Sequence, residues 1–501
     1  MRLSHRVVLI SLLAGIVFVS GFVLKKRSQS QAQTPPSKAR LTLQPCHLAP
    51  GDLDAKCGTY EVFEDRAAKT GRKISLNIVV VPALNPNPAP DPVFWLHGGP
   101  GAAATATAPA VRGGFLAGVH QDHDVVFVDQ RGTGKSNGLM CDMGDDPSNL
   151  QKYFSDLFLL DDVRQCREKL EKIANLKLYT TPIAMDDLDE VRDALGYDKI
   201  DIVAASYGTI AAQVYMRQHP DHVRAVFLGG VANTAIKQPL PFAQAAQHAL
   251  DLLFVDCAAD EPCHNAFPDL KKEFETVLAR FDKGPVTAEL INPKTREKES
   301  VKITRGNFVE HLRLFLYTTN FGRFLPLVIH RAYENDYLPF ESISVAYNPG
   351  GIVSRGMYMT VTCSESIPFI TEKDIVSQTK GTFLGDYRVR THIEGCKEWP
   401  KADIPKSYIQ PVKSDLPVLL ISGEVDGSTP PWLGEEVVES LKNGRQVKIR
   451  YYGHQLDGPC LFGILNEFIE KGSAKSVDTS CTDKIKRPPF ATEIPKQFSL
   501  Q

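Results

Sequence analysis

The strongest constraint on the fold of this chain is a regular alternation of short apolar runs with amphipathic helical runs. Between about residues 59 and 235, two runs carry apolar residues at helical spacing, 185–197 and 207–219. Short apolar segments alternate with them at 73–82, 92–98, 124–132, 199–204 and 223–231. Buried strands that alternate with helices are typical of a parallel, doubly wound sheet. The sequence therefore predicts an α/β fold.

The alternation stops at about residue 236 and resumes at about residue 414. The intervening segment, 236–413, consists mostly of amphipathic helical runs such as "LKKEFETVLARF" and "GNFVEHLRLFLY". Strand and helix patterns return with "LPVLLISG", "QVKIRYYG" and "CLFGILNEFIEKG". We therefore expect a core built from residues 41–235 and 414–501, with 236–413 forming a mainly helical cap, or lid, over the carboxyl edge of the sheet.

The N-terminal segment, residues 1–40, is predicted to lie outside the core. Val7 to Leu24 carry no charge and are flanked by "MRLSHR" and "KKR", and the polar linker "SQSQAQTPPSK" follows. This run is long enough to span a bilayer, and Ser30-x-Ala32 offers a cleavage site for a signal peptide. Export signal and membrane anchor both remain open. In either case we expect a protein that faces the outside of the cytoplasm: periplasmic, secreted or membrane-anchored.

The ten cysteines indicate an oxidising compartment. Their number is even, and they are scattered along the chain without C-x-x-C pairs or histidines at zinc spacing. Behind an export segment this pattern favours disulfides over a metal site, and over the alternative of ten buried free thiols. The sequence does not give the connectivity. Pairing of neighbours, such as 46–57, 257–263 and 460–481, is the entropically simplest arrangement.

The net charge of the chain and the stretch at 131–136 exclude two other classes of function, nucleic-acid binding and nucleotide binding. Lys and Arg total 57 against 59 Asp and Glu, a net charge of −2, so no basic field is available to hold nucleic acid. The stretch "RGTGKS" at 131–136 is similar to the end of a phosphate-binding loop, but Asp129 occupies the position where that loop needs glycine. We therefore expect neither a nucleotide cofactor nor a metal.

Ser206 is the candidate nucleophile. It lies in "DIVAASYGTIAA", between an apolar strand and a helix, where a strained turn exposes a catalytic serine. Small residues flank such a serine because its backbone packs closely on its neighbours. The usual glycine two positions earlier is Ala204, whereas Gly208 is retained. The motif alone equally suits a serine that starts a helix, so the prediction depends on partners.

Partners follow in the order serine, acid, histidine. Asp426 lies in the loop "EVDGSTPP" after one predicted strand, and His454 follows the next strand. Both would lie at the same sheet edge as Ser206. A histidine can take the proton of the serine while a carboxylate holds the imidazole in its working tautomer. Glu424 is a second candidate acid, and we favour Asp426 because it lies deeper in the loop.

The motif "HGGPG", residues 97–101, is the candidate oxyanion hole. It directly follows the predicted strand "PVFWL", and its glycines let backbone N–H groups point at a developing negative charge. We assign one donor to the Gly98–Gly99 region, favouring Gly99, and the other to the N–H of Tyr207.

Together these motifs resemble the proline iminopeptidase and tripeptidyl aminopeptidase family of the α/β-hydrolases. The resemblance rests on "HGGPG", "DQRGTGKS", "AASYGT", "GEVDGSTPP" and the "GH" at 453–454, in this order. It implies an α/β-hydrolase fold and a serine peptidase that releases one to three residues from a free peptide N-terminus through an acyl-enzyme. It also implies cap carboxylates that bind the ammonium group of the substrate. Glu365 in "TCSESIPF", beside Cys363, is the candidate for that role.

Two other functions use parts of the same site. An esterase or other small-acyl hydrolase would share the triad but would need no carboxylate to bind an amine. A binding module on an inactive hydrolase fold would be expected to lack one triad residue, and Ser206, Asp426 and His454 are all present. The sequence does not give the preferred N-terminal residue or the oligomeric state.

Overall fold

This computed structural model describes residues 41–49, 53–347, 353–455 and 457–495. The N-terminal segment 1–40, on which the export prediction rests, lies outside these residues. No helix in the described ranges is long and apolar enough to cross a membrane.

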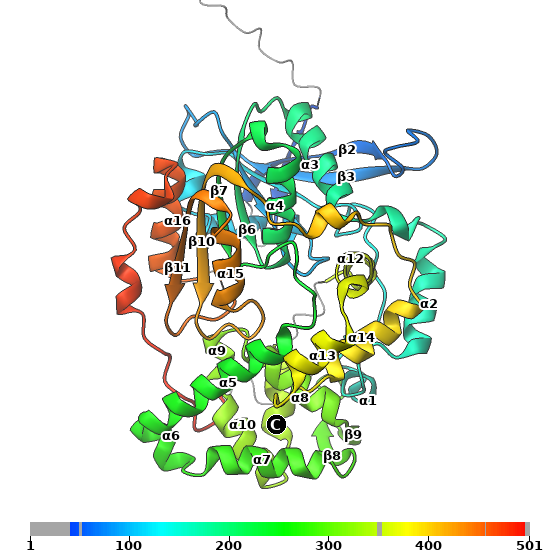
Figure 1. Ribbon diagram of the computed structural model, residues 1–501, viewed down its shortest axis with the longest axis vertical. Coiled ribbons are helices and arrows are strands. Elements are labelled where there is room, and N and C mark those ends of the chain that lie inside the picture. The colour runs from blue at the N-terminus through cyan, green and yellow to red at the C-terminus, as the bar shows by residue number, and fades with distance from the viewer. Residues whose placement is uncertain (1–40, 50–52, 348–352, 456, 496–501) are drawn as a thin grey trace, which may run out of the picture. The chain divides into compact units, whose positions relative to one another are not determined.

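A central sheet organises the described chain (Figure 1). Its strand order is β1-β2-β3-β5-β4-β6-β7-β10-β11. The neighbours from β5 to β11 pair in parallel, whereas β1, β2, β3 and β5 pair antiparallel. The strands are β1 (Gln44–Leu48), β2 (Leu53–Phe63), β3 (Lys73–Val81), β4 (Val93–Leu96), β5 (Val125–Val128), β6 (Ile200–Ala205), β7 (Val223–Gly229), β10 (Ser414–Gly423) and β11 (Leu441–Ile449).

Both faces of the parallel strands are covered. In β4, Phe94 and Leu96 pack into one hydrophobic cluster, whereas Trp95 packs into another on the opposite face. The first face is covered by α3 (Thr181–Leu195), α4 (Tyr207–Gln218) and α15 (Pro431–Val438), and the second by α16 (Pro459–Lys471). The predicted α/β fold with a mostly parallel sheet is confirmed. The antiparallel pair β1–β2, of which β1 is largely exposed, was not predicted.

The segment between β7 and β10 is mainly helical and has a hydrophobic cluster of its own. One run, 270–281, forms a helix with the bounds that its apolar spacing predicts. The segment also contains a hairpin, β8 (Val286–Ile291) with β9 (Lys298–Ile303), which was not predicted. Its helices are α5 (Phe242–Ala259), α6 (Glu261–Ala266), α7 (Leu270–Phe281), α8 (Arg305–Phe315), α9 (Thr319–Gly322), α10 (Leu325–Tyr333), α11 (Leu338–Ala346), α12 (Arg355–Glu365), α13 (Glu372–Thr379) and α14 (Tyr387–Lys397).

Two stretches outside this segment also pack on it. Tyr153 and Phe154, around the short helix α1 (Leu150–Tyr153), belong to its hydrophobic cluster. Near the other end of the chain, Phe490 enters the same cluster and the guanidinium of Arg487 pairs with Asp256. Figure 1 shows the red C-terminal segment running from α16 back to the helices around α10. The boundaries 236–413 for a cap remain a prediction.

All ten cysteines form disulfides between neighbours in the sequence. The pairs are Cys46–Cys57, Cys141–Cys166, Cys257–Cys263, Cys363–Cys396 and Cys460–Cys481. Neighbour pairing was the simplest arrangement by loop-closure entropy, and the structure confirms it. The Cys141 pair ties a loop to α2 (Leu160–Leu170), and the Cys363 pair joins α12 to α14.

The "DQRGTGKS" stretch is anchored by a buried arginine. The guanidinium of Arg131 donates two hydrogen bonds to Asp187 in α3, at 2.6 and 2.9 Å. It also donates to the carbonyls of Glu64 and Leu178, at 2.9 and 2.8 Å. The Arg131 side chain has no exposed surface and that of Asp187 is 2% exposed. The motif therefore ties the loop after β5 to α3 and to the end of β2.

Replacing Arg131 should destabilise the fold. In an Arg131→Met variant the buried carboxylate of Asp187 loses two hydrogen bonds and keeps one from Arg66, at 2.8 Å, so the cost should lie at the low end of the about 3–5 kcal/mol that breaking a buried pair takes. We expect a loss of that size in the free energy of unfolding, measured by denaturant titration. Arg164→Met, at a half-exposed arginine on α2, is the matched control and should change stability by less than about 1 kcal/mol. Equal effects of the two substitutions would contradict this role.

Candidate active site

Ser206 occupies a strained turn between β6 and α4. Its backbone has φ 56° and ψ −129°, a region that residues other than glycine rarely adopt. Two close approaches make this turn possible. A β-carbon on Gly208 would lie 2.2 Å from the carbonyl oxygen of Leu96, and one on Gly98 would lie 2.7 Å from the β-carbon of Ser206. Glycine is therefore required at both positions.

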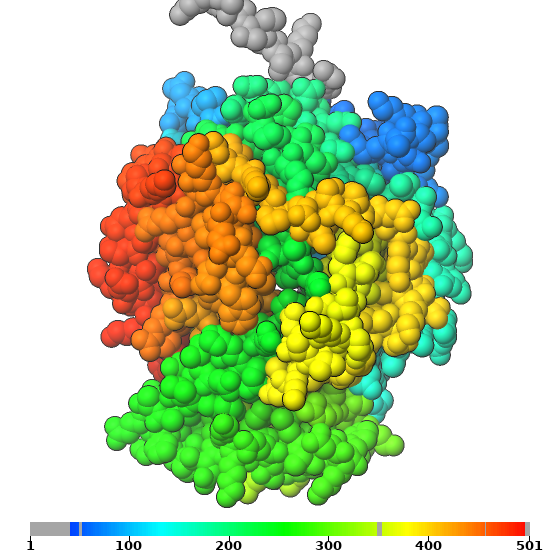
Figure 2. Space-filling view, viewed as in Figure 1, coloured from blue at the N-terminus to red at the C-terminus, as the bar shows by residue number. Residues whose placement is uncertain are grey.

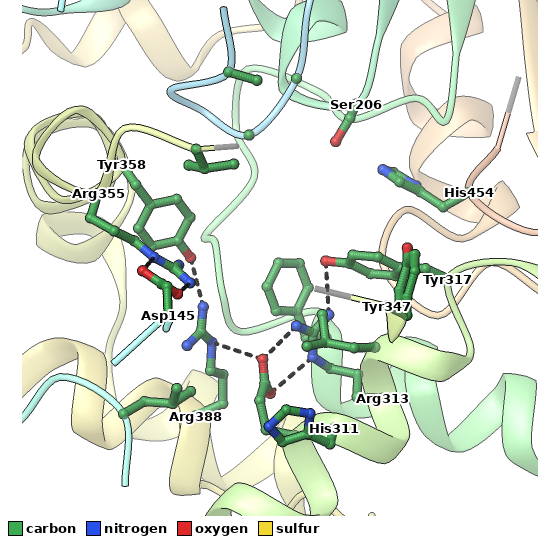
Figure 3. Close-up of a pocket in the computed structure, with 18 of the residues that line it drawn as sticks. Asp145, Ser206, His311, Arg313, Tyr317, Tyr347, Arg355, Tyr358, Arg388 and His454 are labelled. Carbon is green, nitrogen blue, oxygen red and sulfur yellow. Dashed lines mark hydrogen bonds and ion pairs between the residues drawn. The ribbon is translucent and has the colours of Figure 1, made fainter. Parts of the chain in front are cut away.

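Ala204, the departure from the usual motif, lies in the strand that precedes the turn. It is fully buried in β6 and pairs with Leu96 of β4 on one side and Leu228 of β7 on the other. The turn keeps its strained form with a methyl group at this position. Figure 3 shows the Ser206 hydroxyl projecting into a cavity that the imidazole of His454 also faces.

Asp426 and His454 lie in the loops after β10 and β11 and contact each other. One carboxylate oxygen of Asp426 is 2.8 Å from Nδ1 of His454. The other oxygen accepts hydrogen bonds from the backbone N–H groups of Ser428 and Thr429, both at 2.8 Å. Burial alone would raise the pKa of Asp426, but the imidazole and these N–H donors hold it below its usual value. Of the two acids considered, Asp426 and not Glu424 contacts the histidine.

The two candidate oxyanion donors lie on either side of Ser206. Tyr207 is the first residue of α4, so its N–H has no acceptor within the helix. The N–H of Gly98 donates to Nδ1 of His97 at 2.7 Å, which leaves Gly99 as the next amide along the chain. Gly99 lines the cavity. The preference for Gly99 over Gly98 therefore has a structural reason, and the role of both amides remains a prediction.

Glu365 lies away from the cavity that holds Ser206. It ends α12, is 3% exposed, and accepts hydrogen bonds from the N–H and hydroxyl of Thr181, at 2.6 and 2.7 Å, and from Tyr408. Thr181 in turn contacts the hydroxyl of Tyr207 at 2.6 Å. The structure gives no support to the prediction that Glu365 binds a substrate's ammonium group. Its carboxylate instead belongs to a hydrogen-bond network behind the nucleophile turn.

A cavity of about 320 Å³ adjoins Ser206, which is the size range of small-ligand pockets. Loops of the sheet and helices α5, α8, α12 and α14 supply its walls. Its charged side chains, among the described residues, are Asp145, Glu310, Arg313, Arg355 and Arg388. Sequence analysis missed all five. The spacing of Glu310 and Arg313 within the otherwise apolar run of α8 was an available signal, since a charged pair three residues apart lies on one helix face.

Two histidines of the cavity wall are held neutral. Burial lowers the pKa of His97 to about 4, although the negative charge of Asp129 opposes the shift. Burial also lowers the pKa of His311 to about 4, and Glu310 only partly opposes it. The ring of His311 packs against the aromatic rings of Tyr153, Phe154 and Phe340.

The surface of the protein has a hollow between α15, in orange, and α12 and α13, in yellow (Figure 2).

Elsewhere in the described chain, two groups of side chains have metal-ligand proximity. Cys363, His392 and Cys396 form one, but its cysteines are joined in a disulfide. Asp189, His219 and His222 form the other. There the carboxylate of Asp189 already accepts hydrogen bonds from Arg192 and from the hydroxyl of Tyr215, both at 2.8 Å. Neither group borders the cavity.

Comparison with known proteins agrees with this geometry. Residues 91–256 match the family model described as alpha/beta hydrolase fold, and residues 381–481 match that of TAP-like proteins. The chain therefore has the α/β-hydrolase fold. It is 23% identical over 426 residues to the serine protease Hip1 of Mycobacterium tuberculosis, covering 77% of this chain and 79% of Hip1.

Two shorter matches point to the same group. The tripeptidyl aminopeptidase of Streptomyces lividans is 28% identical over 192 residues, 36% of this chain and 35% of that protein. The proline iminopeptidase of Neisseria gonorrhoeae is 28% identical over 145 residues, 29% of this chain and 34% of that protein. The names of these relatives, a serine protease and two peptidases, agree with the family that the sequence resemblance predicts.

The buried histidines predict a fall in stability at acidic pH. In the unfolded chain a histidine takes up a proton near pH 6.5, whereas His97 and His311 in the fold resist it until about pH 4. The free energy of unfolding should therefore fall as the pH drops from about 6.5 to about 4, by up to about 1.4 kcal/mol per pH unit for each histidine.

Replacing His311 isolates its contribution to the loss of stability at acidic pH. His311→Phe keeps an aromatic ring in the cluster but removes the titrating group, so its loss of stability between pH 7 and pH 5 should be smaller than that of the unmodified protein. His264→Gln, at an exposed histidine on α6, should retain the full loss. Denaturant titrations at both pH values measure the difference, and the same loss in His311→Phe as in the unmodified protein would count against a neutral buried ring.

Proposed function

We propose that this protein is an exported serine aminopeptidase that releases one to three residues from a free peptide N-terminus. The observation that carries the proposal is the arrangement of Ser206, His454 and Asp426 at the carboxyl edge of a parallel sheet, beside a cavity bounded by helices. The named relatives include aminopeptidases and a serine protease. Five disulfides support export, because disulfides persist in oxidising compartments.

In the proposed mechanism, Ser206 attacks the carbonyl carbon of the scissile peptide bond. His454 takes the serine proton through Nε2, because its Nδ1 faces Asp426. The N–H groups of Gly99 and Tyr207 stabilise the oxyanion. The protonated imidazole then gives its proton to the leaving amine, which departs and leaves an acyl-enzyme on Ser206. Water, activated by His454, hydrolyses that ester and restores the serine.

The ammonium group of the substrate would meet a carboxylate of the cavity wall. Asp145 and Glu310 are the two carboxylates that line it, so they take the role first predicted for Glu365. One observation favours the alternative of an esterase or other small-acyl hydrolase. Each of the two carboxylates already holds an arginine through two hydrogen bonds, which leaves fewer oxygen lone pairs for an amine.

Loss of the serine hydroxyl should abolish turnover and leave the fold intact. Ser206→Ala removes the nucleophile at a partly exposed position, so we expect no measurable hydrolysis and little change in the thermal unfolding midpoint. A fluorophosphonate probe, which labels activated serines, should label the unmodified protein and not the variant. Appreciable residual hydrolysis by Ser206→Ala would defeat the assignment.

Whether the enzyme requires a free N-terminus on its substrate distinguishes an aminopeptidase from an esterase. We expect Ala-Ala-Ala-p-nitroanilide to be cleaved with a kcat/KM at least about tenfold higher than its N-acetylated form, because acetylation removes the charge that a cavity carboxylate would bind. p-Nitrophenyl acetate serves as the control, since the triad alone should hydrolyse it. Equal rates on the two peptides would argue for the small-acyl hydrolase.

A further inference from the structure

The wall of the active-site cavity carries more positive than negative charge. Three guanidinium groups, those of Arg313, Arg355 and Arg388, line it together with two carboxylates, those of Asp145 and Glu310. Two of the histidines that line the cavity, His97 and His311, are held neutral by burial, so they do not change this balance. One cationic side chain is therefore in excess among the described residues of the wall.

The hydrogen bonds identify which arginine is in excess. Arg355 holds Asp145 through Nε, at 2.7 Å, and through a second guanidinium nitrogen. Arg313 holds Glu310 in the same way, at 2.9 and 2.5 Å. Two-point pairing of this kind is the strong form of an arginine–carboxylate contact. Both carboxylates are thus engaged by arginines other than Arg388.

Arg388 forms only a long ion pair, with a carboxylate that Arg313 already binds. Its Nε lies 3.8 Å from an oxygen of Glu310, beyond hydrogen-bond distance, and this buried N–H has no acceptor. The side chain is 8% exposed, so water screens its charge poorly. A buried charge without a hydrogen-bonded counter-ion is costly, and an anion bound beside this guanidinium would reduce that cost.

The guanidinium of Arg388 is nevertheless held in one position. One of its terminal nitrogens donates to the hydroxyl of Tyr358 at 2.9 Å, and its plane lies over the ring of Phe158, 5.0 Å from the ring centre. A binding group that is already fixed loses little conformational entropy when a ligand arrives. Figure 3 shows Arg388 and Arg355 on the side of the cavity opposite Ser206 and His454.

We propose that Arg388 is a carboxylate-binding site for the substrate, which selects peptides that carry a negative charge a short distance from the scissile bond. This inference deepens the proposed function and rests on it. The carboxylate can come from two sources, an aspartate or glutamate side chain or the C-terminal carboxylate of a short peptide. A neutral peptide leaves the excess charge of the wall uncompensated, whereas an anionic peptide neutralises it.

The first experiment measures binding without catalysis. Calorimetric titration of the Ser206→Ala protein uses tripeptide amides in which glutamate or glutamine occupies each of the three positions in turn, with alanine elsewhere. A second pair, Ala-Ala-Ala as free acid and as amide, tests the C-terminal carboxylate. At one position or in the second pair, we expect the carboxylate form to bind about tenfold more tightly, the effect of one charge-assisted hydrogen bond.

Variants on helix α14 assign the effect to one arginine. Arg388→Met in the Ser206→Ala background should remove the preference, and Arg388→Lys, which keeps the charge, should retain part of it. Arg390→Met is the matched control, because Arg390 lies two residues away, is exposed, and pairs with Glu372 and Asp386. It should leave the preference unchanged. Equal binding of all carboxylate and amide pairs, or a preference that survives Arg388→Met, would overturn the proposal.

Measurements of turnover test the carboxylate subsite at Arg388 and the peptidase activity separately. With active enzyme, the glutamate p-nitroanilides should show a kcat/KM about tenfold above the glutamine ones at the position found by calorimetry. If carboxylate binding holds and no peptide is cleaved, the subsite stands and the peptidase function fails. If peptides are cleaved with equal kcat/KM for both series and calorimetry shows no preference, the peptidase function stands and the subsite fails.

Discussion

The parallel direction of β4, β6, β10 and β11 is the constraint on which the candidate site depends. Parallel strands present their carboxyl ends at one edge, so the loops that follow them meet there although they lie more than three hundred residues apart in the sequence. The glycine-rich loop, Ser206, Asp426 and His454 each follow one of these strand ends. Short loops from a rigid sheet also limit the freedom of each side chain, which lets a strained backbone persist at Ser206.

This dependence explains why the sequence indicates the core of the candidate site and does not indicate its outer wall. Strand ends are recognisable in a single sequence, because each follows a short apolar run and carries a polar residue. The wall is different, since Glu310, Arg355 and Arg388 come from three helices, α8, α12 and α14, whose packing depends on tertiary contacts. Local spacing shows that a helix forms but does not say which helices share a cavity. The antiparallel strands β1 and β2 escaped prediction because their exposed and buried residues are interspersed and form no continuous apolar run.

Glu365 shows the same difficulty within one helix. Its neighbour Cys363 does form a disulfide, so the local argument identified a well-anchored stretch. The carboxylate of Glu365 nevertheless contacts Thr181 and Tyr408 and does not line the cavity. Thr181 begins α3 and contacts the hydroxyl of Tyr207, the residue after Ser206. The helical segment thus touches the nucleophile turn from behind through a polar network, while its arginines face the same turn across the cavity.

Because each disulfide joins cysteines that are neighbours in the sequence, none of them links the helical segment to the rest of the chain. Three pairs lie before residue 236 or after residue 413, and two lie between these positions. Every covalent bridge therefore closes within one block of sequence, and the contacts between the helical segment and the sheet are hydrogen bonds, ion pairs and packed side chains. The disulfides therefore stiffen each block separately and leave the contacts between the blocks, where the cavity lies, free to adjust to a ligand without any covalent bond being broken.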